Sequence, residues 1–93
     1  MATVNVVTGT PSGKLPQNGL FDWINPNTTG GSCEVTGVSG WCTQSSYTVP
    51  QATGPNSPGT CTASTQNISG TFSFSSSCIP PGTPAPVIHV GSM

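Results

Sequence analysis

Gly19-Leu20-Phe21-Asp22-Trp23-Ile24-Asn25 is the stretch of this chain that carries the clearest structural signal. Residues Leu20–Asn25 combine aromatic and aliphatic side chains, and turn-forming residues stand on either side of them, which is typical of a β-strand. Trp23 lies near the centre of the segment, where a β-sandwich places its core tryptophan. The stretch therefore predicts one core strand of an all-β domain.

The rest of the chain repeats this pattern and argues against helices. Ten prolines and 12 glycines are interleaved with β-branched residues, so no window shows the 3.6-residue periodicity of a helix. Seven further segments between turn residues predict strands: Thr3–Thr8, Ser32–Thr36, Gly40–Ser45, Tyr47–Pro50, Gly59–Thr65, Thr71–Cys78 and Pro86–Val90. Short strands at this spacing predict a single domain over residues 1–93 that is a small β-sandwich or barrel.

The cysteines at positions 33, 42, 61 and 78 predict two disulfides. Only 32% of the 93 residues are hydrophobic, so crosslinks would compensate for a thin core, and they indicate an oxidising environment. If Gly37-Val38 and Ser69-Gly70 are two-residue hairpin turns, the antiparallel registers set Cys33 opposite Cys42 and Cys61 opposite Cys78. We therefore favour these two pairs, although four cysteines allow two other connectivities.

A structural zinc site is the alternative use of the same cysteines. Their spacings contain no C-x-x-C pair, and His89 is the only histidine in the chain. We expect no metal and no other cofactor.

Charged side chains are almost absent, because Lys14, Asp22 and Glu34 are the only permanent ions and the net charge is -1. Without a basic stripe the chain cannot displace counterions from phosphates, so we expect no nucleic acid partner. Apolar runs are only a few residues long, which argues against a membrane partner. Solubility must come from hydroxyls and amides, from burial in an assembly, or from attached sugar.

We expect no secretion signal at the amino terminus of this chain. Met1-Ala2-Thr3 leads directly into an alternating run, with no charged region, apolar region or cleavage site before it. We expect either a mature domain that received a start methionine, or a gene product made in a cytoplasm and exposed to oxidant later, such as a virion component released by lysis.

From Pro16 onward the order of features resembles the cupredoxin-like fold. Gly19–Asn25 is similar to the cupredoxin strand that carries a glycine, an acidic or polar residue, a tryptophan and an asparagine. Gly70-Thr71-Phe72-Ser73-Phe74, followed by Cys78, is similar to the run that leads to the copper-binding cysteine of that family, and His89 falls on the last strand. The resemblance implies a small Greek-key β-sandwich or barrel of cupredoxin-like type, and an immunoglobulin-like sandwich is the alternative.

The ligands of a blue copper site are nevertheless missing. Such a site needs two histidines, one cysteine and usually a methionine, whereas residues 26–34 contain no histidine and a long proline loop separates Cys78 from His89. A cysteine that forms a disulfide cannot bind copper. The resemblance therefore implies a scaffold whose metal site has been lost.

The few titratable residues do not suggest catalysis. Asp22 and Glu34 would have to meet for paired acid-base chemistry, and no basic residue supports them, so we expect no enzyme and interpret both as solubilising or turn-stabilising groups. Alternation places Val87 and His89 on one face of the last strand and Ile88 and Val90 on the other. We expect a hydrogen-bonded imidazole at His89, the alternative being a group that titrates near neutral pH at an interface.

Trp41 and Tyr47 are the candidate contact residues for a ligand or partner. Trp41 precedes Cys42, so in a strand with an inward disulfide its side chain would point outward, and an exposed tryptophan commonly marks a surface that contacts sugar or protein. Asn27 and Asn67 both satisfy the N-x-S/T acceptor rule and fall in loops or at hairpin ends, which makes them candidate glycosylation sites.

The leading hypothesis is a non-enzymatic structural module on an extracellular particle, either a virion decoration or head-fibre type protein or a surface filament subunit. Its partners would be copies of itself or capsid and filament proteins, and residues Thr3–Val7 would pair with a neighbour's sheet edge. A polysaccharide-binding module that uses Trp41 and Tyr47 is the alternative, and an electron-transfer copper protein is a third hypothesis. The expected location is extracellular or on a virion surface.

Overall fold

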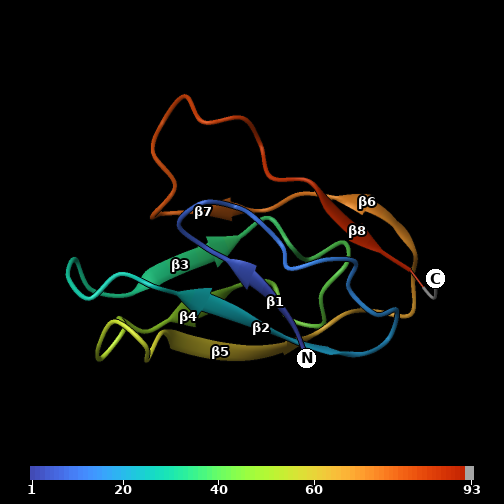
Figure 1. Ribbon diagram of the computed structural model, residues 1–93. Helices are drawn as coiled ribbons and strands as arrows, with labels where there is room; N and C mark the ends of the chain where they lie inside the picture. Colours follow the sequence, from blue (N-terminus) through green and yellow to red (C-terminus); the bar gives the residue numbers. More distant parts are fainter. Residues whose placement is uncertain (92–93) are drawn as a thin grey trace.

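Three small β-sheets surround one apolar core in the computed structural model of the chain, which describes residues 1–91 (Figure 1). The strands are β1 (Ala2–Asn5), β2 (Leu20–Asn25), β3 (Cys33–Thr36), β4 (Tyr47–Val49), β5 (Gly59–Ser64), β6 (Gly70–Phe72), β7 (Ser75–Ser76) and β8 (Ile88–Val90). No helix occurs within residues 1–91. The prediction of an all-β domain is confirmed, and the Cα radius of gyration of 12.3 Å is close to the ~12 Å of a compact domain of this length.

The first sheet has the strand order β1-β2-β5. Strand β2 occupies the residues predicted for it, and it pairs in parallel with β1 and antiparallel with β5. Because side chains alternate along a strand, Phe21, Trp23 and Asn25 point into the core and are fully buried, while the residues between them face outward. The expectation that Trp23 is a core residue is confirmed.

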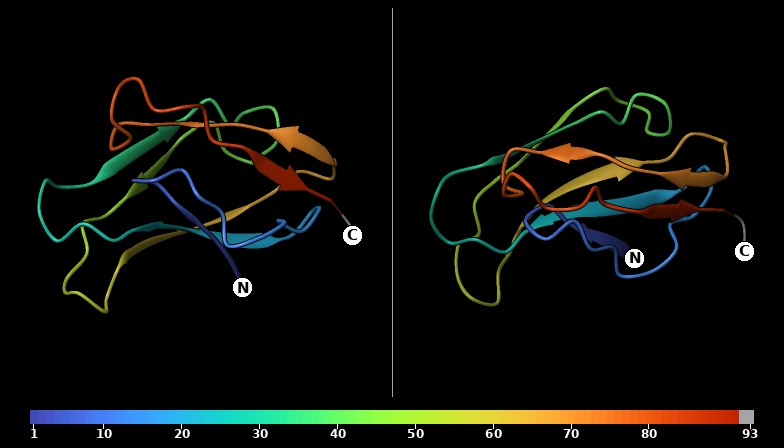
Figure 2. Two further views of the ribbon diagram at one scale, coloured as in Figure 1. Left: turned by 45° about the horizontal axis from the view of Figure 1, so that its top comes forward. Right: turned by 90° about the horizontal axis from the view of Figure 1, so that it is seen from above.

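The second sheet has the order β4-β3-β7, and the third is the pair β6-β8. Figure 2 shows β2 and β5 on one side of the molecule and β3 and β7 on the other. The chain crosses between these two layers three times: from β2 to the β3-β4 hairpin, from β4 back to β5, and from β5 by way of β6 to β7. Val35 and Val49 supply buried aliphatic side chains from this side.

The pairing of β3 with β7 determines the disulfide. Val35 lies opposite Ser76 and Thr36 opposite Ser75, so the same antiparallel register places Cys33 opposite Cys78. These two cysteines are bonded, with their Cα atoms 5.6 Å apart. The predicted pairs Cys33–Cys42 and Cys61–Cys78 are therefore wrong, and the described residues, which include all four cysteines, hold one disulfide rather than two.

The predicted pairs fail because neither of the two assumed hairpins forms. Gly70 begins a strand that pairs with β8, opposite Val90, and does not turn back onto β5. Gly37 follows the last residue of β3, and the next residues form a tight turn in which the amides of Trp41 and Cys42 both donate to the Val38 carbonyl. The registers deduced from these two assumed turns therefore differ from the registers that the long-range strand pairing produces.

The remaining two cysteines cannot bond to each other in this fold. Cys42 makes an isolated bridge with Thr65, which is four residues along the chain from Cys61. At the rise of a strand this separation is about 13 Å, well beyond the ~7 Å limit between the Cα atoms of a disulfide. Cys42 and Cys61 therefore carry free thiols.

Two other predicted strands differ from the structure. Gly40–Ser45 is a turn with a single bridge at Cys42, because its backbone bonds to Val38 before it can extend. Thr71–Cys78 is divided into β6 and β7, which pair with different sheets. The chain therefore changes sheets at Ser73-Phe74, and this change shapes the groove described below.

The amino-terminal strand is not available to a neighbouring molecule in this structure. One edge of β1 pairs with β2, and the other is covered by residues 10–12. Across that second edge the Asn5 amide donates to the Thr10 carbonyl and the Ser12 amide donates to the Thr3 carbonyl. A pairing of Thr3–Val7 with another subunit would therefore require this strand to give up hydrogen bonds that it makes within its own chain.

Gly59 lies where the backbone after β4 passes very close to the start of β5. A Cβ atom at this position would lie 1.7 Å from the Pro50 carbonyl oxygen, so only glycine fits. We expect Gly59→Ala to lower the free energy of unfolding by about 3 kcal/mol or more, because backbone would have to move. Gly40→Ala is the matched control, since a Cβ atom there meets nothing within 4 Å, and it should stay within about 0.5 kcal/mol of wild type in urea denaturation. Equal stability of the two variants would contradict this.

The Cys33–Cys78 crosslink should contribute a large part of the stability. It joins residues separated by 45 positions, and in the chain-entropy model a loop of that size is worth about 4 kcal/mol. We expect the Cys33→Ala/Cys78→Ala variant to lose roughly that amount in chemical denaturation under non-reducing conditions. The Cys42→Ala/Cys61→Ala variant, which keeps the crosslink, is the control and should lose less; the reverse order would disprove the assignment.

Candidate functional site

The aromatic residues expected at the surface are buried. Trp41 is 2% exposed and Tyr47 is 4% exposed, so neither ring presents a face to a sugar or a protein partner. The expectation of an exposed Trp41 is wrong because residues 38–42 form a turn, and strand alternation does not apply there. Trp41 and Cys42 consequently both point inward, and the Trp41 Nε1 donates to the Ser73 carbonyl at 2.9 Å.

These rings form one aromatic cluster around Trp23. The Trp23 ring makes edge contacts with Phe74 and Phe21, at centroid separations of 4.8 and 5.0 Å. It also lies 5.8 Å from the Tyr47 ring and 6.0 Å from the Trp41 ring. The cluster is the structural centre of the domain, not a ligand platform. Within residues 1–91, the buried Trp23 Nε1 and Tyr47 hydroxyl have no hydrogen-bond partner.

The two free thiols are held in their protonated form. Burial raises the pKa of the Cys42 thiol from 9.0 to about 12. Burial also raises the pKa of the half-buried Cys61 thiol, and the nearby Asp22 carboxylate adds to the effect. Because the thiolate is the reactive form, neither cysteine is suited to nucleophilic or redox chemistry at neutral pH.

The two carboxylates lie on different sheets and each is bound by a threonine. Asp22 on β2 accepts a hydrogen bond of 2.8 Å from Thr62, its direct partner on β5. Glu34 on β3 accepts bonds of 2.9 and 3.1 Å from Thr48, its direct partner on β4. Both are cross-strand pairs without backbone bonds between them, the arrangement that brings side chains closest. The two acids therefore do not come together as a catalytic pair.

His89 lies on the exposed face of β8, and Val87 shares that face, whereas Ile88 and Val90 are buried. The predicted alternation is confirmed. The His89 Nδ1 lies 3.3 Å from the Thr71 hydroxyl on β6, as expected for a hydrogen-bonded imidazole. In the part of the chain that the structure describes, no group of three or more histidine, cysteine or acidic residues is arranged to hold a metal ion.

Both candidate glycosylation sites are exposed. Asn27 follows β2, and its amide donates to the side chain of the buried Asn25 at 3.0 Å. Asn67 lies between β5 and β6, where its side-chain oxygen accepts a hydrogen bond from Gln17. Exposure is required for an acceptor asparagine and does not by itself indicate modification.

The outward surface of β1-β2-β5 carries a single charged side chain, Asp22. We call it the outer face; its residues are Met1, Thr3, Asn5, Leu20, Asp22, Ile24, Thr60, Thr62 and Ser64. The most exposed large apolar side chains among residues 1–91 include Met1 at 76% and Leu20 at 55%. Register places these two at the same end of the face, and Asp22, its one carboxylate, is bound by Thr62.

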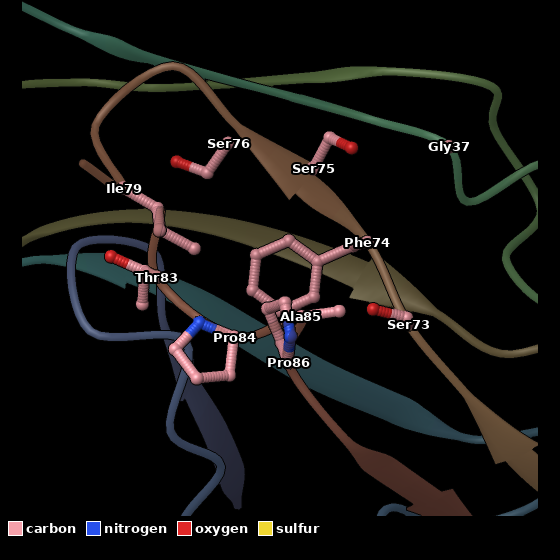
Figure 3. Close-up of a pocket in the computed structure, with 10 residues that line it drawn as sticks. All are labelled: Gly37, Ser73, Phe74, Ser75, Ser76, Ile79, Thr83, Pro84, Ala85 and Pro86. Carbon is pink, nitrogen blue, oxygen red and sulfur yellow. The ribbon is translucent and has the colours of Figure 1, made fainter. Parts of the chain in front are cut away.

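A groove of about 370 Å³ opens on another side of the molecule, between β7 and the proline-rich segment that precedes β8 (Figure 3). Residues 73–76 form one wall and residues 83–86 form the other, while Gly37 and Ile79 complete it. Figure 3 shows the Phe74 ring beside Pro84 and Pro86, with hydroxyls of Ser73, Ser75, Ser76 and Thr83 around it. None of the lining residues is charged.

The groove exists because prolines interrupt a β-ladder. The β6-β8 register pairs Phe72 with Ile88, so its continuation would pair Phe74 with Pro86 and Ser76 with Pro84. The His89 carbonyl accepts from Leu15 on the opposite edge, so the even-numbered residues of this strand are those that face β6 and β7. Proline has no amide hydrogen to donate at either position, so the two segments separate. Both prolines are visible in the sequence, but only the strand register shows that they occupy the positions that face β7.

Comparison with protein-family models, with curated proteins and with solved structures finds nothing that matches this chain. No helix in residues 1–91 is long and apolar enough to cross a membrane. The functional conclusion therefore depends on the surfaces described above.

The thiol pKa values predict a loss of stability at alkaline pH. The folded-state pKa of Cys42 lies above its unfolded value of 9.0, so the folded protein holds its proton more tightly and stability decreases as pH rises from about 9 through about 12. The phenol of Tyr47, whose pKa burial also raises, acts in the same direction. Urea denaturation at pH 7, 9 and 10.5 should show this decrease in the free energy of unfolding. In Cys42→Ala the free energy of unfolding should fall less steeply with pH. An equally steep fall in that variant would show that the Cys42 thiol is not responsible.

Proposed function

We propose that this chain is a non-enzymatic structural module that assembles with copies of itself or with a larger particle through uncharged surfaces. The observation that carries the proposal is the outer face, a sheet surface with exposed Met1 and Leu20 and a single carboxylate. Identical faces that carry only one charged side chain each repel one another far less than densely charged surfaces do.

The hydrogen bonds of the two carboxylates support this proposal. Asp22 and Glu34 each accept hydrogen bonds from the hydroxyl of a facing threonine, so part of the hydrogen-bonding capacity of each carboxylate is already satisfied within the protein. An interface over either carboxylate would then leave its bound oxygen paired with a hydroxyl. Lys14 is the only cationic side chain in the sequence, so attraction between opposite charges contributes little to partner choice.

We further propose a location outside the reducing cytoplasm, on an extracellular particle such as a virion or a surface filament. The Cys33–Cys78 disulfide supports this, because such bonds persist in oxidising environments. For the fold, we propose a Greek-key β-sandwich of cupredoxin-like type without the copper site. Two observations support that assignment: the chain crosses repeatedly between the layers, from β2 to β3, from β4 to β5 and from β5 by way of β6 to β7, and residues 19–25 and 70–74 resemble that family.

Self-association through the outer face is directly testable. We expect the weight-average mass of the wild-type protein to rise with concentration in sedimentation experiments. Leu20→Glu places a charge in the apolar end of the face and should weaken association by at least about tenfold, or ~1.4 kcal/mol. Ser45→Glu adds the same charge at an exposed loop and serves as the control. A wild-type protein that stays monomeric up to its solubility limit would remove the outer-face proposal.

A further inference from the structure

We propose that the groove between β7 and residues 83–86 binds an extended, uncharged segment of another protein, which adds to β7 as a β-strand. This site is separate from the outer face, and the inference holds whether or not the module self-associates. It goes beyond the proposed function because it assigns a second surface and the chemistry of its partner. The argument begins with the backbone groups that line the groove.

Phe74 and Ser76 present unpaired backbone groups to the groove. Ser77 donates to Glu34 on β3, so residues 75 and 77 face β3 while residues 74 and 76 face the opposite way, toward the groove. Among residues 1–91 the amides of Phe74 and Ser76 and the Phe74 carbonyl have no hydrogen-bond partner, whereas the Ser76 carbonyl accepts from the Ile79 amide. Two amides and one carbonyl are therefore free at strand spacing.

The opposite wall cannot satisfy these groups, but it can cover an added strand. Pro84 and Pro86 occupy the two positions that face β7, and neither has an amide hydrogen to donate. Their rings offer apolar surface instead. Pro86 and Ile79 pack against Gly9, where a Cβ atom would lie 2.9 Å from Pro86 Cγ. This wall of the groove therefore contacts the loop after β1 directly.

These features specify the occupant. Free amides and a carbonyl at residues i and i+2 match the hydrogen-bonding edge of an extended polypeptide, as in strand addition to an exposed sheet edge. The absence of any charged lining residue selects a segment without acidic or basic side chains, because a buried ion would find no partner. The volume of about 370 Å³ is at the lower end for ligand sites, which suits a few residues of such a segment.

The proposal is tested by titrating isotope-labelled protein with a blocked hexapeptide of alternating threonine and valine, followed by NMR. We expect saturable shifts and slower hydrogen exchange at the Phe74 and Ser76 amides. The same peptide with N-methylated amides along one edge cannot complete the ladder and should bind at least about tenfold more weakly. Recording the titration also on Leu20→Glu keeps the result independent of association through the outer face.

A pair of variants tests the role of the prolines. Pro84→Thr/Pro86→Thr restores the two missing amides, so the protein's own ladder should extend to residue 76, protect the Phe74 and Ser76 amides and abolish peptide binding. Pro80→Thr/Pro81→Thr changes two exposed prolines outside the register and should bind as wild type does.

The following results would overturn the proposal. One is the absence of any chemical-shift change at the Phe74 and Ser76 amides when the peptide concentration reaches several times 1 mM. Binding with a Kd of about 1 mM would be visible at that concentration. Another is equal binding of the N-methylated peptide, which does not depend on any variant folding. Slow exchange of both amides in the free wild-type protein would show that they are already bonded. Concentration-dependent shifts there without peptide would place a second copy in the groove instead of a foreign segment.

Discussion

The packing of aromatic rings around Trp23 is the interaction on which the rest of the structure depends. Its neighbours come from separate parts of the chain: Phe21 from β2, Trp41 from the turn after β3, Tyr47 from β4 and Phe74 from the segment between β6 and β7. A chain of 93 residues buries only about two-thirds of its unfolded surface, so a few large rings must supply much of the apolar burial. Because rings from both layers pack around Trp23, a sequence with few apolar residues can still form a core.

The disulfide and the aromatic cluster act on the same long-range arrangement. Cys33 and Cys78 connect the middle of the chain with its last third, across the β3-β7 pairing that closes the second sheet. Such non-local contacts carry a high loop-closure cost, which the crosslink removes from the unfolded state. The other two cysteines are packed as small apolar side chains, and their raised pKa values follow from that burial.

Uncharged chemistry governs the surface as well as the core. Threonines opposite Asp22 and Glu34 bind the only two acidic side chains, and hydroxyls surround the groove. Prolines have a specific structural effect there, since Pro84 and Pro86 occupy the hydrogen-bonding positions of a ladder that would otherwise continue. The outer face and the groove are thus two different surfaces, one a completed sheet and the other an interrupted one.

The sequence alone determined the features that depend on local alternation and composition: an all-β chain, the strand at residues 20–25, the burial of Trp23 and the two faces of the last strand. Only the tertiary structure decided which strands pair, and therefore which cysteines bond, where Trp41 points and where the groove opens. The physical reason is range. Alternation and turn chemistry act over a few residues, whereas Cys33 meets Cys78 through a register set 45 residues apart, and the turn at Val38 cancels the alternation that would have exposed Trp41.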